Sequence, residues 1–322
     1  MKKEYEHPAV LRYRNFCKEH LYDIHAFQAK HIEKSQGNER RVWPKNVFVP
    51  SWYAFEILNR KFQDPHTVKQ FDYTDDSLWG LVCCSAWRLT LGVYRFDPSV
   101  YKALFESSSS IAKIPSEVFN RLPAWCVYIE TPGLVFPDVD HEFVRGFWVY
   151  IDSRPTISSS CLLNLVFDIV YGDGLPQTWR TLRLDIEDLT TEDMVANTEY
   201  ETFLLKVLSL VLWLCAEKPD EDLRDEPFFE KKNQPSPVKI KGQFKYIPPH
   251  HATIHNVAER IGSEIRNSRD ELSRLSTGKR VRAHIRKAHW HGVWTGPEGN
   301  RVYKLNWWPP VLVGGLANTK NA

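Results

Sequence analysis

The sequence has no apolar stretch long enough to cross a membrane as a helix. Its most apolar run, from Phe203 to Ala216, contains Lys206 and is shorter than the ~20 residues that a bilayer span requires. The segment from Met1 to Pro8 carries charges without an apolar stretch behind them, so it does not have the pattern of a secretory signal. We therefore expect a cytoplasmic protein without a membrane partner.

The sequence also lacks the short motifs that mark common catalytic centres. It contains no CxxC pair, no phosphate-binding glycine-rich loop and no G-x-S-x-G elbow. His251 and His255 have the i, i+4 spacing of two zinc ligands on a helix, but the glutamate that a metalloprotease carries after the first histidine is missing. We interpret a second cluster as a solvated loop: Asp138, Asp140, His141 and Glu142. We therefore expect no catalytic residue, no metal, no cofactor and no small-molecule substrate.

The cysteines do not suggest a disulfide framework. All six lie among apolar or aromatic residues, where a cysteine behaves as a small hydrophobic side chain. We expect free, buried thiols in a reducing compartment at Cys17, Cys83, Cys84, Cys126, Cys161 and Cys215.

The chain has little net charge, +2 at pH 7, so the molecule as a whole does not attract nucleic acid. Any binding of a polyanion must therefore come from a local patch. The hydrophobic fraction of 43% and the twelve tryptophans are sufficient for a sizeable core, because tryptophan buries a large area.

The hydrophobic pattern predicts an α+β fold with N-terminal helices, a central antiparallel sheet, long amphipathic helices and a C-terminal β-hairpin. Helical spacing predicts helices over residues 8–33, 51–62, 77–91, 198–215 and 252–275, with Ser51 capping the second and a capping box at Thr198 to Glu201. β-branched and aromatic runs predict strands over residues 125–129, 143–151, 161–170 and 178–184. We expect four consecutive regions, separate or within one compact domain: a mainly helical region 1–120, a sheet with a helix 121–216, a mobile acidic and proline-rich loop 217–249, and a helix with a basic hairpin 250–322.

Basic and aromatic residues alternate between Lys279 and Trp294. In a strand this places Lys287, His289 and His291 on one face, and on the other Arg282, His284, Arg286, Trp290 and Trp294. A returning strand would follow a turn at residues 296–300, and Glu298 is the only acidic residue from 279 to 304. Cations attract phosphates and flat rings stack on bases. The candidate residues for RNA or another polyanion are Arg280, Arg282, His284, Arg286, Lys287, His289, Trp290, His291, Trp294, Arg301 and Lys304.

The same segment fits three other interpretations. Its tryptophans and histidines could pack the end of a sheet while the cations stay in solvent, or the patch could bind an acidic protein. A ribonuclease could use His289 and His291 as general acid and base, because imidazole titrates close to neutral pH. Alternate strand positions face the same way, however, and do not ensure the opposed geometry of in-line attack.

Several tryptophan-rich strings resemble those of a known protein family. They are Trp87 to Tyr94, Leu122 to Tyr128, Gly146 to Trp148, Leu212 to Asp220, Ile261 to Arg266 and His284 to Gly292, with a closing Trp-x-Pro-x-Val at Trp307, Pro309 and Val311. From about residue 78 to the end and in this order, they resemble the second described family of type V-A anti-CRISPR proteins.

The resemblance implies a protein of a phage or another mobile element that inhibits the type V-A CRISPR effector, a single-chain RNA-guided DNA nuclease, in a bacterial cytoplasm. Such proteins are thought to recognise the N-terminal segment of the effector during its translation and to lower its mRNA. The implied partner is the effector polypeptide, with the ribosome or mRNA as further candidates, and the implied role is not enzymatic.

An apolar groove or an exposed sheet edge for the nascent peptide would be expected in the tryptophan-rich β region and its adjoining helices, and RNA contact in the basic segment. Two alternatives stay open. The first is a ribonuclease or RNA-binding regulator centred on the C-terminal hairpin, and the second is a plasmid or phage structural protein without RNA contact.

Overall fold

The computed structural model describes residues 6–17, 25, 46–62, 76–109, 114–137, 142–153, 161–171, 179–186, 198–216, 235–275 and 284–313. The chain divides into two compact units, each assembled from three segments. Unit 1 consists of residues 1–94, 122–189 and 227–255, and unit 2 of residues 95–121, 190–226 and 256–322. The units thus interleave along the chain.

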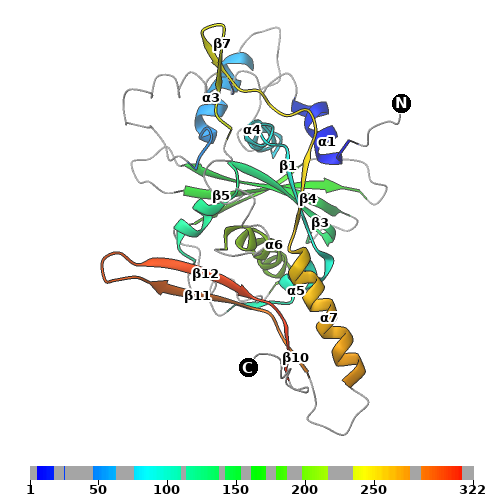
Figure 1. Cartoon of the computed structure of the whole chain (residues 1–322). Helices are drawn as coiled ribbons and strands as arrows, with labels where there is room; N and C mark the ends of the chain where they lie inside the picture. Colours follow the sequence, from blue (N-terminus) through cyan, green and yellow to red (C-terminus); the bar gives the residue numbers. More distant parts are fainter. Residues whose placement is uncertain are drawn as a thin grey trace. The chain divides into compact units, whose positions relative to one another are not determined.

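The largest sheet is mixed, with the strand order β6-β5-β4-β3-β1-β9 (Figure 1). Four consecutive strands run antiparallel to one another: β3 (Cys126–Val135), β4 (Phe143–Ser153), β5 (Cys161–Val170) and β6 (Arg180–Asp185). They confirm the antiparallel strands predicted from the sequence, and the α+β class is confirmed with them. The sequence pattern missed β1 (Gly92–Phe96), which pairs parallel to β3, and β9 (Thr253–Val257).

The helices of unit 1 are α1 (Pro8–Cys17), α3 (Ser51–Phe62) and α4 (Asp76–Trp87). They confirm the predicted helix at 51–62 and the beginning of the one at 8–33, of which most residues beyond Cys17 lie outside the described part. The helix predicted over 77–91 is present but ends at Trp87, where a turn leads to Leu91 with a φ of +47°. Ser51 does not cap α3 with its own hydroxyl. Its backbone N–H donates to Asp152 at 2.9 Å and its hydroxyl donates to the same carboxylate, so the sheet supplies the capping group.

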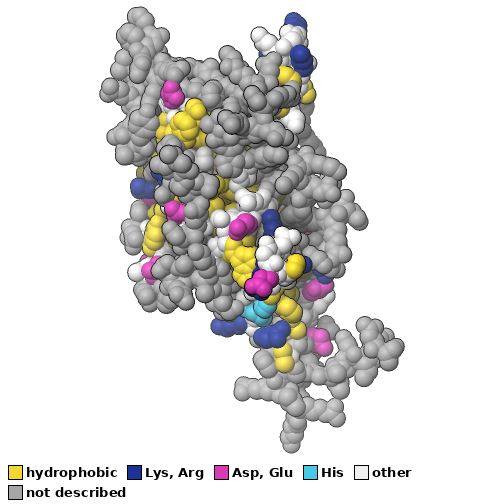
Figure 2. Space-filling model, turned by 90° about the vertical axis from the view of Figure 1, so that its left-hand side faces the viewer, with side chains coloured by type: hydrophobic (Ala, Val, Ile, Leu, Met, Phe, Trp, Pro, Cys, Tyr) yellow, Lys and Arg dark blue, Asp and Glu magenta, His cyan; other side chains and the backbone are white. Residues whose placement is uncertain are grey.

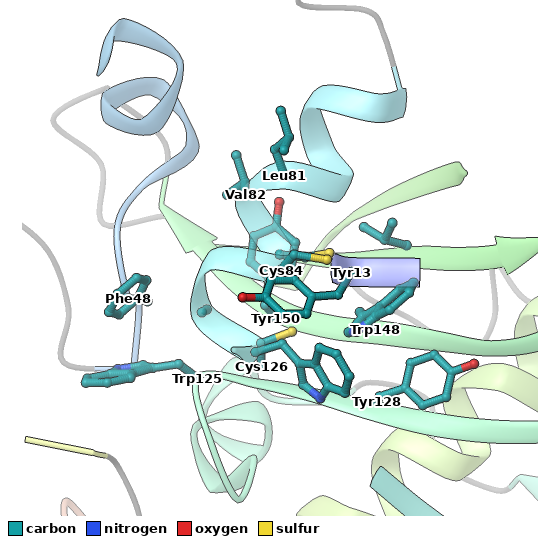
Figure 3. Packing of buried hydrophobic residues seen from close by; sticks show 14 of the residues in the cluster. Tyr13, Phe48, Leu81, Val82, Cys84, Trp125, Cys126, Tyr128, Trp148 and Tyr150 are labelled. Atoms are coloured by element: carbon teal, nitrogen blue, oxygen red, sulfur yellow. The ribbon is translucent and has the colours of Figure 1, made fainter. Parts of the chain in front are cut away.

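Tryptophans from the strings that resemble the family fill the core of unit 1 (Figure 3). Trp148 is fully buried, and its ring meets the rings of Trp87, Tyr128 and Trp179 edge to face at centroid distances of 5.7, 4.8 and 5.9 Å. The indole N–H of Trp87 donates to the carbonyl of Gly92 at 2.8 Å. These rings are therefore core side chains, and they do not line a groove as the sequence hypothesis expected.

Five of the six cysteines lie in the part with described side chains, and these five form no disulfide there. Cys83, Cys84, Cys126 and Cys215 are buried, as the sequence predicted, whereas Cys161 is half-buried. Burial raises the pKa of Cys215 to about 12, so its thiol stays protonated at neutral pH.

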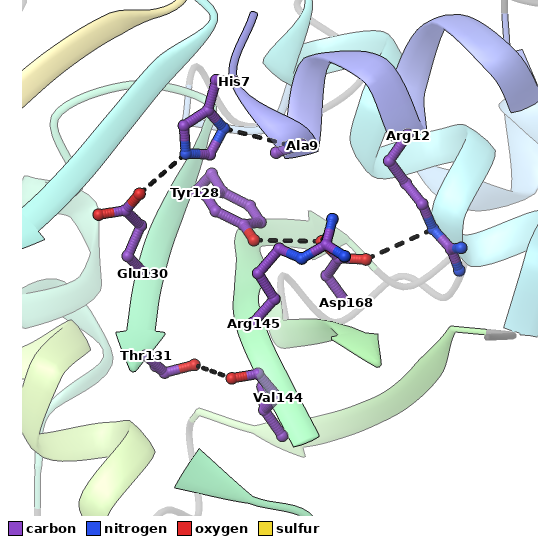
Figure 4. Close-up of polar contacts among 9 residues, drawn as sticks. All are labelled: His7, Ala9, Arg12, Tyr128, Glu130, Thr131, Val144, Arg145 and Asp168. Carbon is purple, nitrogen blue, oxygen red and sulfur yellow. Dashed lines mark hydrogen bonds and ion pairs between the residues drawn. The ribbon is translucent and has the colours of Figure 1, made fainter. Parts of the chain in front are cut away.

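A polar cluster fixes α1 to the sheet of unit 1 (Figure 4). His7 accepts from the N–H of Ala9 through Nδ1, so its Nε2 carries the proton that is donated to Glu130 at 2.8 Å. The buried Asp168 accepts from the Tyr128 hydroxyl at 3.2 Å and lies near two guanidinium groups, 3.4 Å from Arg12 and 3.9 Å from Arg145. Burial raises the pKa of Asp168 above its ordinary value, against the opposing effect of the two arginines.

The stability of unit 1 should depend on pH through His25. Its ring is 7% exposed and donates Nε2–H to the carbonyl of Ser85 at 2.6 Å, and burial lowers its pKa from 6.5 to about 4. Between these values the unfolded state binds more protons than the folded state, so stability is lost as pH falls from 6.5 towards 4, by roughly 3 kcal/mol. His25→Gln retains an N–H donor without a titrating ring and should flatten this slope in urea unfolding measured across the pH range. Equal slopes in both proteins would contradict the assignment.

Unit 2 contains α5 (Pro98–Phe105), η1 (Ser116–Arg121), α6 (Glu199–Cys215) and α7 (Glu259–Leu275). The predicted capping box is present at the start of α6, where Thr198 and Glu201 bond each other's backbone N–H. The helix predicted over 252–275 starts later, because residues 253–257 form β9 and Ala258 has a φ of +66°. His255 therefore lies in a strand, and the helical zinc-ligand spacing with His251 does not exist.

None of the helices in the described ranges combines the length and the apolar content needed to cross a bilayer. Residues 217–234 of the predicted mobile loop lie outside the described part. The rest of that loop contains a two-stranded ribbon, β7 (Val238–Ile240) and β8 (Gln243–Lys245).

Gly262 allows α7 to pack closely against the start of α5. Asp97 caps α5 by accepting from the N–H of Ser99 at 2.8 Å, and its carboxylate also accepts two hydrogen bonds from Arg266 at 2.8 and 2.7 Å. A Cβ on Gly262 would stand 2.1 Å from this carboxyl group. The string from Ile261 to Arg266 thus encodes a contact between two helices.

Gly262→Ala is expected to destabilise the protein by about 1–3 kcal/mol, because the new methyl must displace Asp97 from its two partners. Helix propensity alone would predict the opposite sign, since alanine is favoured over glycine by up to about 1 kcal/mol. The matched control is Gly92→Ala, whose Cβ would meet its nearest neighbour, Tyr94, at an ordinary 3.5 Å. Urea unfolding of both variants checks this, and a stabilised Gly262→Ala would contradict it.

Candidate nucleic-acid interface

The predicted C-terminal hairpin is present as β11 (His289–Thr295) and β12 (Val302–Trp308), which pair antiparallel over their whole length. The three-stranded sheet is completed by β2 (Ser108–Ser109), parallel to β11. Pro309 and Pro310 interrupt the returning strand, because proline has no N–H for the ladder. The chain pairs again beyond them, as β10 (His284–Arg286) with β13 (Val311–Val313).

The strand register divides the hairpin into two faces. We define the outer face by eight residues in four directly opposed pairs: His289 with Trp308, His291 with Asn306, Val293 with Lys304, and Thr295 with Val302. The inner face carries the remaining six: Trp290, Gly292, Trp294, Tyr303, Leu305 and Trp307.

The inner face belongs largely to the core of unit 2. Trp290 is 2% exposed and Leu305 is fully buried, while the indole N–H of Trp307 donates to Ser107 at 2.9 Å. The Tyr303 ring covers Gly292, where a Cβ would lie 1.7 Å from its hydroxyl oxygen. The Arg121 guanidinium donates to the carbonyl of Tyr303 at 2.7 Å and thereby ties β12 to η1.

The outer face combines rings and cations at the surface. The His289 ring lies nearly parallel to that of Trp308, with an interplanar angle of 12° and a centroid distance of 6.2 Å, and the His291 ring meets Trp308 edge-on at 6.4 Å. Trp308 is 48% exposed and Val302 is 52% exposed. Figure 2 shows one side of the molecule, on which hydrophobic, basic, acidic and histidine side chains lie close together below its centre.

The candidate residues identified from the sequence lie in several different places in the structure. His289, His291 and Lys304 lie together on the outer face, and Arg286, Lys287 and Arg301 are exposed beside the two ends of the hairpin. Trp294 is 52% exposed on the inner face, where its ring meets Tyr303 at 5.1 Å. His284 lies in β10, and Arg280 and Arg282 are outside the described residues.

Two features differ from the sequence expectation. The segment is not one continuous strand, since Lys287 and Ala288 separate β10 from β11. Trp290 is buried, so its ring offers no stacking surface to a base. Trp308, which the alternation did not mark, provides the exposed ring instead, and its position directly opposite His289 becomes visible only once the strand register is known.

The two histidines are not arranged as the acid and base of an in-line reaction. Both imidazoles lie on one face and both contact the same Trp308 ring. A general base and a general acid must instead reach opposite sides of the reacting phosphate. The outer face is therefore better suited to binding through stacking and charge than to cleavage.

The other sequence candidates do not assemble into a site. Among the side chains described, no cluster of three histidine, cysteine, aspartate or glutamate residues could hold a metal ion. Glu142 is buried and lies 3.6 Å from Arg180 as an ion pair, while Asp138, Asp140 and His141 are outside the described residues.

Comparison with known proteins identifies the family. A sequence model described as the anti-CRISPR type V subtype A2 family, AcrVA2-like, matches residues 94–315. A solved structure described as the crystal structure of AcrVA2 superposes with a TM-score of 0.65 at 23% identity, covering 96% of this chain and 100% of that one. A search of curated protein sequences found no match. Because the family model spans more than half of the chain, the protein belongs to the AcrVA2-like family of type V-A anti-CRISPR proteins.

Proposed function

We propose that this protein lowers the amount of a type V-A CRISPR effector by binding the N-terminal segment of the nascent effector and promoting loss of its mRNA. The observation that carries the proposal is the family match over residues 94–315. In this proposal the protein acts in the cytoplasm of a bacterial host through binding alone, without a catalytic residue, a metal or a cofactor. The ribosome or the mRNA is a further partner.

A nascent N-terminal segment leaves the ribosome as an extended chain, and extended peptides are commonly bound by addition to an exposed strand. The β7–β8 ribbon of unit 1 is suited to this mode. Its Lys241-Gly242 turn has positive φ at both residues, +49° and +79°, which matches the right-handed twist of a tight hairpin. Among the described residues, β7 and β8 pair only with each other, so both outer edges are open to a third strand.

The surface of the ribbon favours a peptide with apolar side chains. Val238 is 43% exposed and Ile240 is 38% exposed, and they project from one face of β7. Residues 235–258 include three lysines and no acidic residue. Apolar contact and positive charge are thus available together, and they would complement a peptide that carries apolar or acidic side chains.

The proposal is tested by capture of the full-length protein on immobilised peptides from the N-terminus of the effector. We expect retention on the native peptide and none on a scrambled peptide of the same composition. Equal retention on both would contradict sequence-specific recognition.

A second candidate function is a ribonuclease or RNA-binding regulator that uses the C-terminal hairpin. The observation that favours RNA binding is that His289, His291 and Lys304 lie together on the outer face, although placement of both histidines on one face does not favour cleavage. Incubation of purified protein with effector mRNA in the absence of ribosomes separates cleavage from the proposal above. Cleavage that disappears in the double variant His289→Ala, His291→Ala would support the ribonuclease, and intact mRNA would reject it.

A further inference from the structure

We propose that the outer face of the hairpin is a binding site for single-stranded RNA, with bases stacking on the ring of Trp308 and phosphates held by the cations around it. This inference deepens and rests on the second candidate function, RNA binding by the C-terminal hairpin, and it concerns a different surface and a different ligand from recognition of the effector peptide.

The first argument is that packing explains only the inner face. Trp290, Leu305 and Tyr303 are in place because they fill the core of unit 2. On the opposite side, Trp308 at one end of β12 is 48% exposed and Val302 at the other end is 52% exposed. The exposed indole of Trp308 is not needed to fill the core, and tryptophan is enriched at binding interfaces.

The second argument is the ring geometry. The near-parallel rings of His289 and Trp308 stand on adjacent strands, so their flat faces have a common orientation. A base that stacks on one ring is thereby aligned with the other. Stacking of this kind does not depend on base identity, because every base has a π face.

The third argument is the charge around these rings. Lys304 lies within the outer face, and Arg286, Lys287 and Arg301 are exposed at the two ends of the hairpin. Glu298, at the turn, is the only acidic residue from 284 to 313. A seven-residue strand spans about 20 Å, so the cations can follow the backbone of a short RNA segment.

The arrangement favours a single strand over a duplex. In an RNA helix the bases are stacked inside, where an exposed tryptophan cannot reach their faces, and recognition then relies on the shape of the minor groove. An acidic protein would also be attracted by the cations, but it would not require the parallel orientation of the two rings.

The test measures fluorescence anisotropy of a labelled, unstructured single-stranded RNA of about 20 nucleotides with the full-length protein and no effector present. We expect affinity to fall about tenfold or more between 50 and 200 mM salt, since three or four phosphate contacts release counterions. Trp308→Ala should weaken binding roughly tenfold, which is a typical loss for one stacked base. A perfect duplex of the same sequence should bind more weakly than the single strand.

The matched control is Trp294→Ala, because Trp294 is similarly exposed but lies on the inner face of the same hairpin. We expect the affinity of this variant for the RNA to remain within twofold of that of the unchanged protein. The inference is overturned if the unchanged protein does not bind RNA, if the two variants lose equal affinity, or if polyglutamate displaces the RNA at equal charge concentration. The assay contains no effector peptide, so absence of RNA binding would not argue against peptide recognition. Absence of peptide capture would likewise not argue against RNA binding.

Discussion

Replacing Trp148 by alanine is expected to lower the free energy of unfolding by about 3–5 kcal/mol, the range for removal of a large buried aromatic ring. Trp148 is fully buried on β4 and contacts the rings of Trp87, Tyr128 and Trp179. Alanine would leave a cavity among side chains that cannot collapse, because the sheet and α4 hold them. Edge-to-face contacts with three rings would be lost as well.

The matched control for Trp148→Ala is Trp308→Ala, the same substitution on an exposed strand position. Because Trp308 is 48% exposed, we expect its replacement to change stability by no more than about 0.5 kcal/mol. Urea unfolding of both variants tests whether the tryptophans of this family serve two separate purposes. Similar losses in the two variants would contradict the division into core and surface rings.

The second large effect is expected at the β7–β8 ribbon. The double variant Val238→Asp, Ile240→Asp should reduce capture on the effector N-terminal peptide at least tenfold, because it places charge on both exposed apolar positions of β7. Stability should change little, since neither side chain is buried. Capture assays with full-length protein provide the measurement.

The control for the ribbon is Ile254→Asp, which makes the same kind of change at a 39% exposed position of β9. It should leave capture unchanged. If both proteins lose capture equally, or if neither does, the peptide does not dock on the ribbon. Equal retention of the unchanged protein on the native and the scrambled peptide would instead reject nascent-peptide recognition itself.

The sequence predicted those elements whose pattern is local. The capping box at Thr198 identified the start of α6, and the run of apolar and β-branched residues identified β5 with its observed bounds. Both signals arise within one segment, because a capping box depends on two residues three positions apart and a buried strand on consecutive apolar residues.

Elements that depend on distant partners were missed or misplaced. Residues 253–257 carry apolar positions at helical spacing, yet they form β9, in which the N–H of Thr253 donates to the carbonyl of Leu91 at 3.1 Å. Ser51 has the residue type of a helix cap, but Asp152, a hundred residues away, provides the capping carboxylate. Tertiary hydrogen bonds of this kind override local preference, and the local sequence pattern does not predict them.

The candidate site shows the same division. The alternation between His289 and Trp294 correctly separated the two faces of β11, because it depends on one strand. It could not show that one face is buried, and it therefore included Trp290 and omitted Trp308. The role of Trp308 depends on the pairing of β11 with β12, which is fixed by the turn at residues 296–300 and not by the strand itself.

The family strings encode packing contacts more than binding contacts. Gly146 lies where a Cβ would stand 2.4 Å from the Tyr128 ring, and Gly262 lies against Asp97. Trp87 and Trp148 fill one core. A resemblance carried by such residues identifies the fold reliably, whereas the surfaces proposed for the peptide and for RNA had to be found from exposure, charge and strand register.

The central claim is that the protein recognises the effector as a peptide during translation, and reporter mRNA in living cells tests it most directly. Two reporters begin with the N-terminal codons of the effector. In the first, these codons are replaced by synonymous codons; in the second, the reading frame is shifted across them and is restored downstream. We predict that the protein lowers the mRNA of the recoded reporter, which keeps the peptide, and leaves the frameshifted one unchanged. A loss of the frameshifted mRNA together with survival of the recoded one would show that the nucleotide sequence is recognised, and would contradict the account.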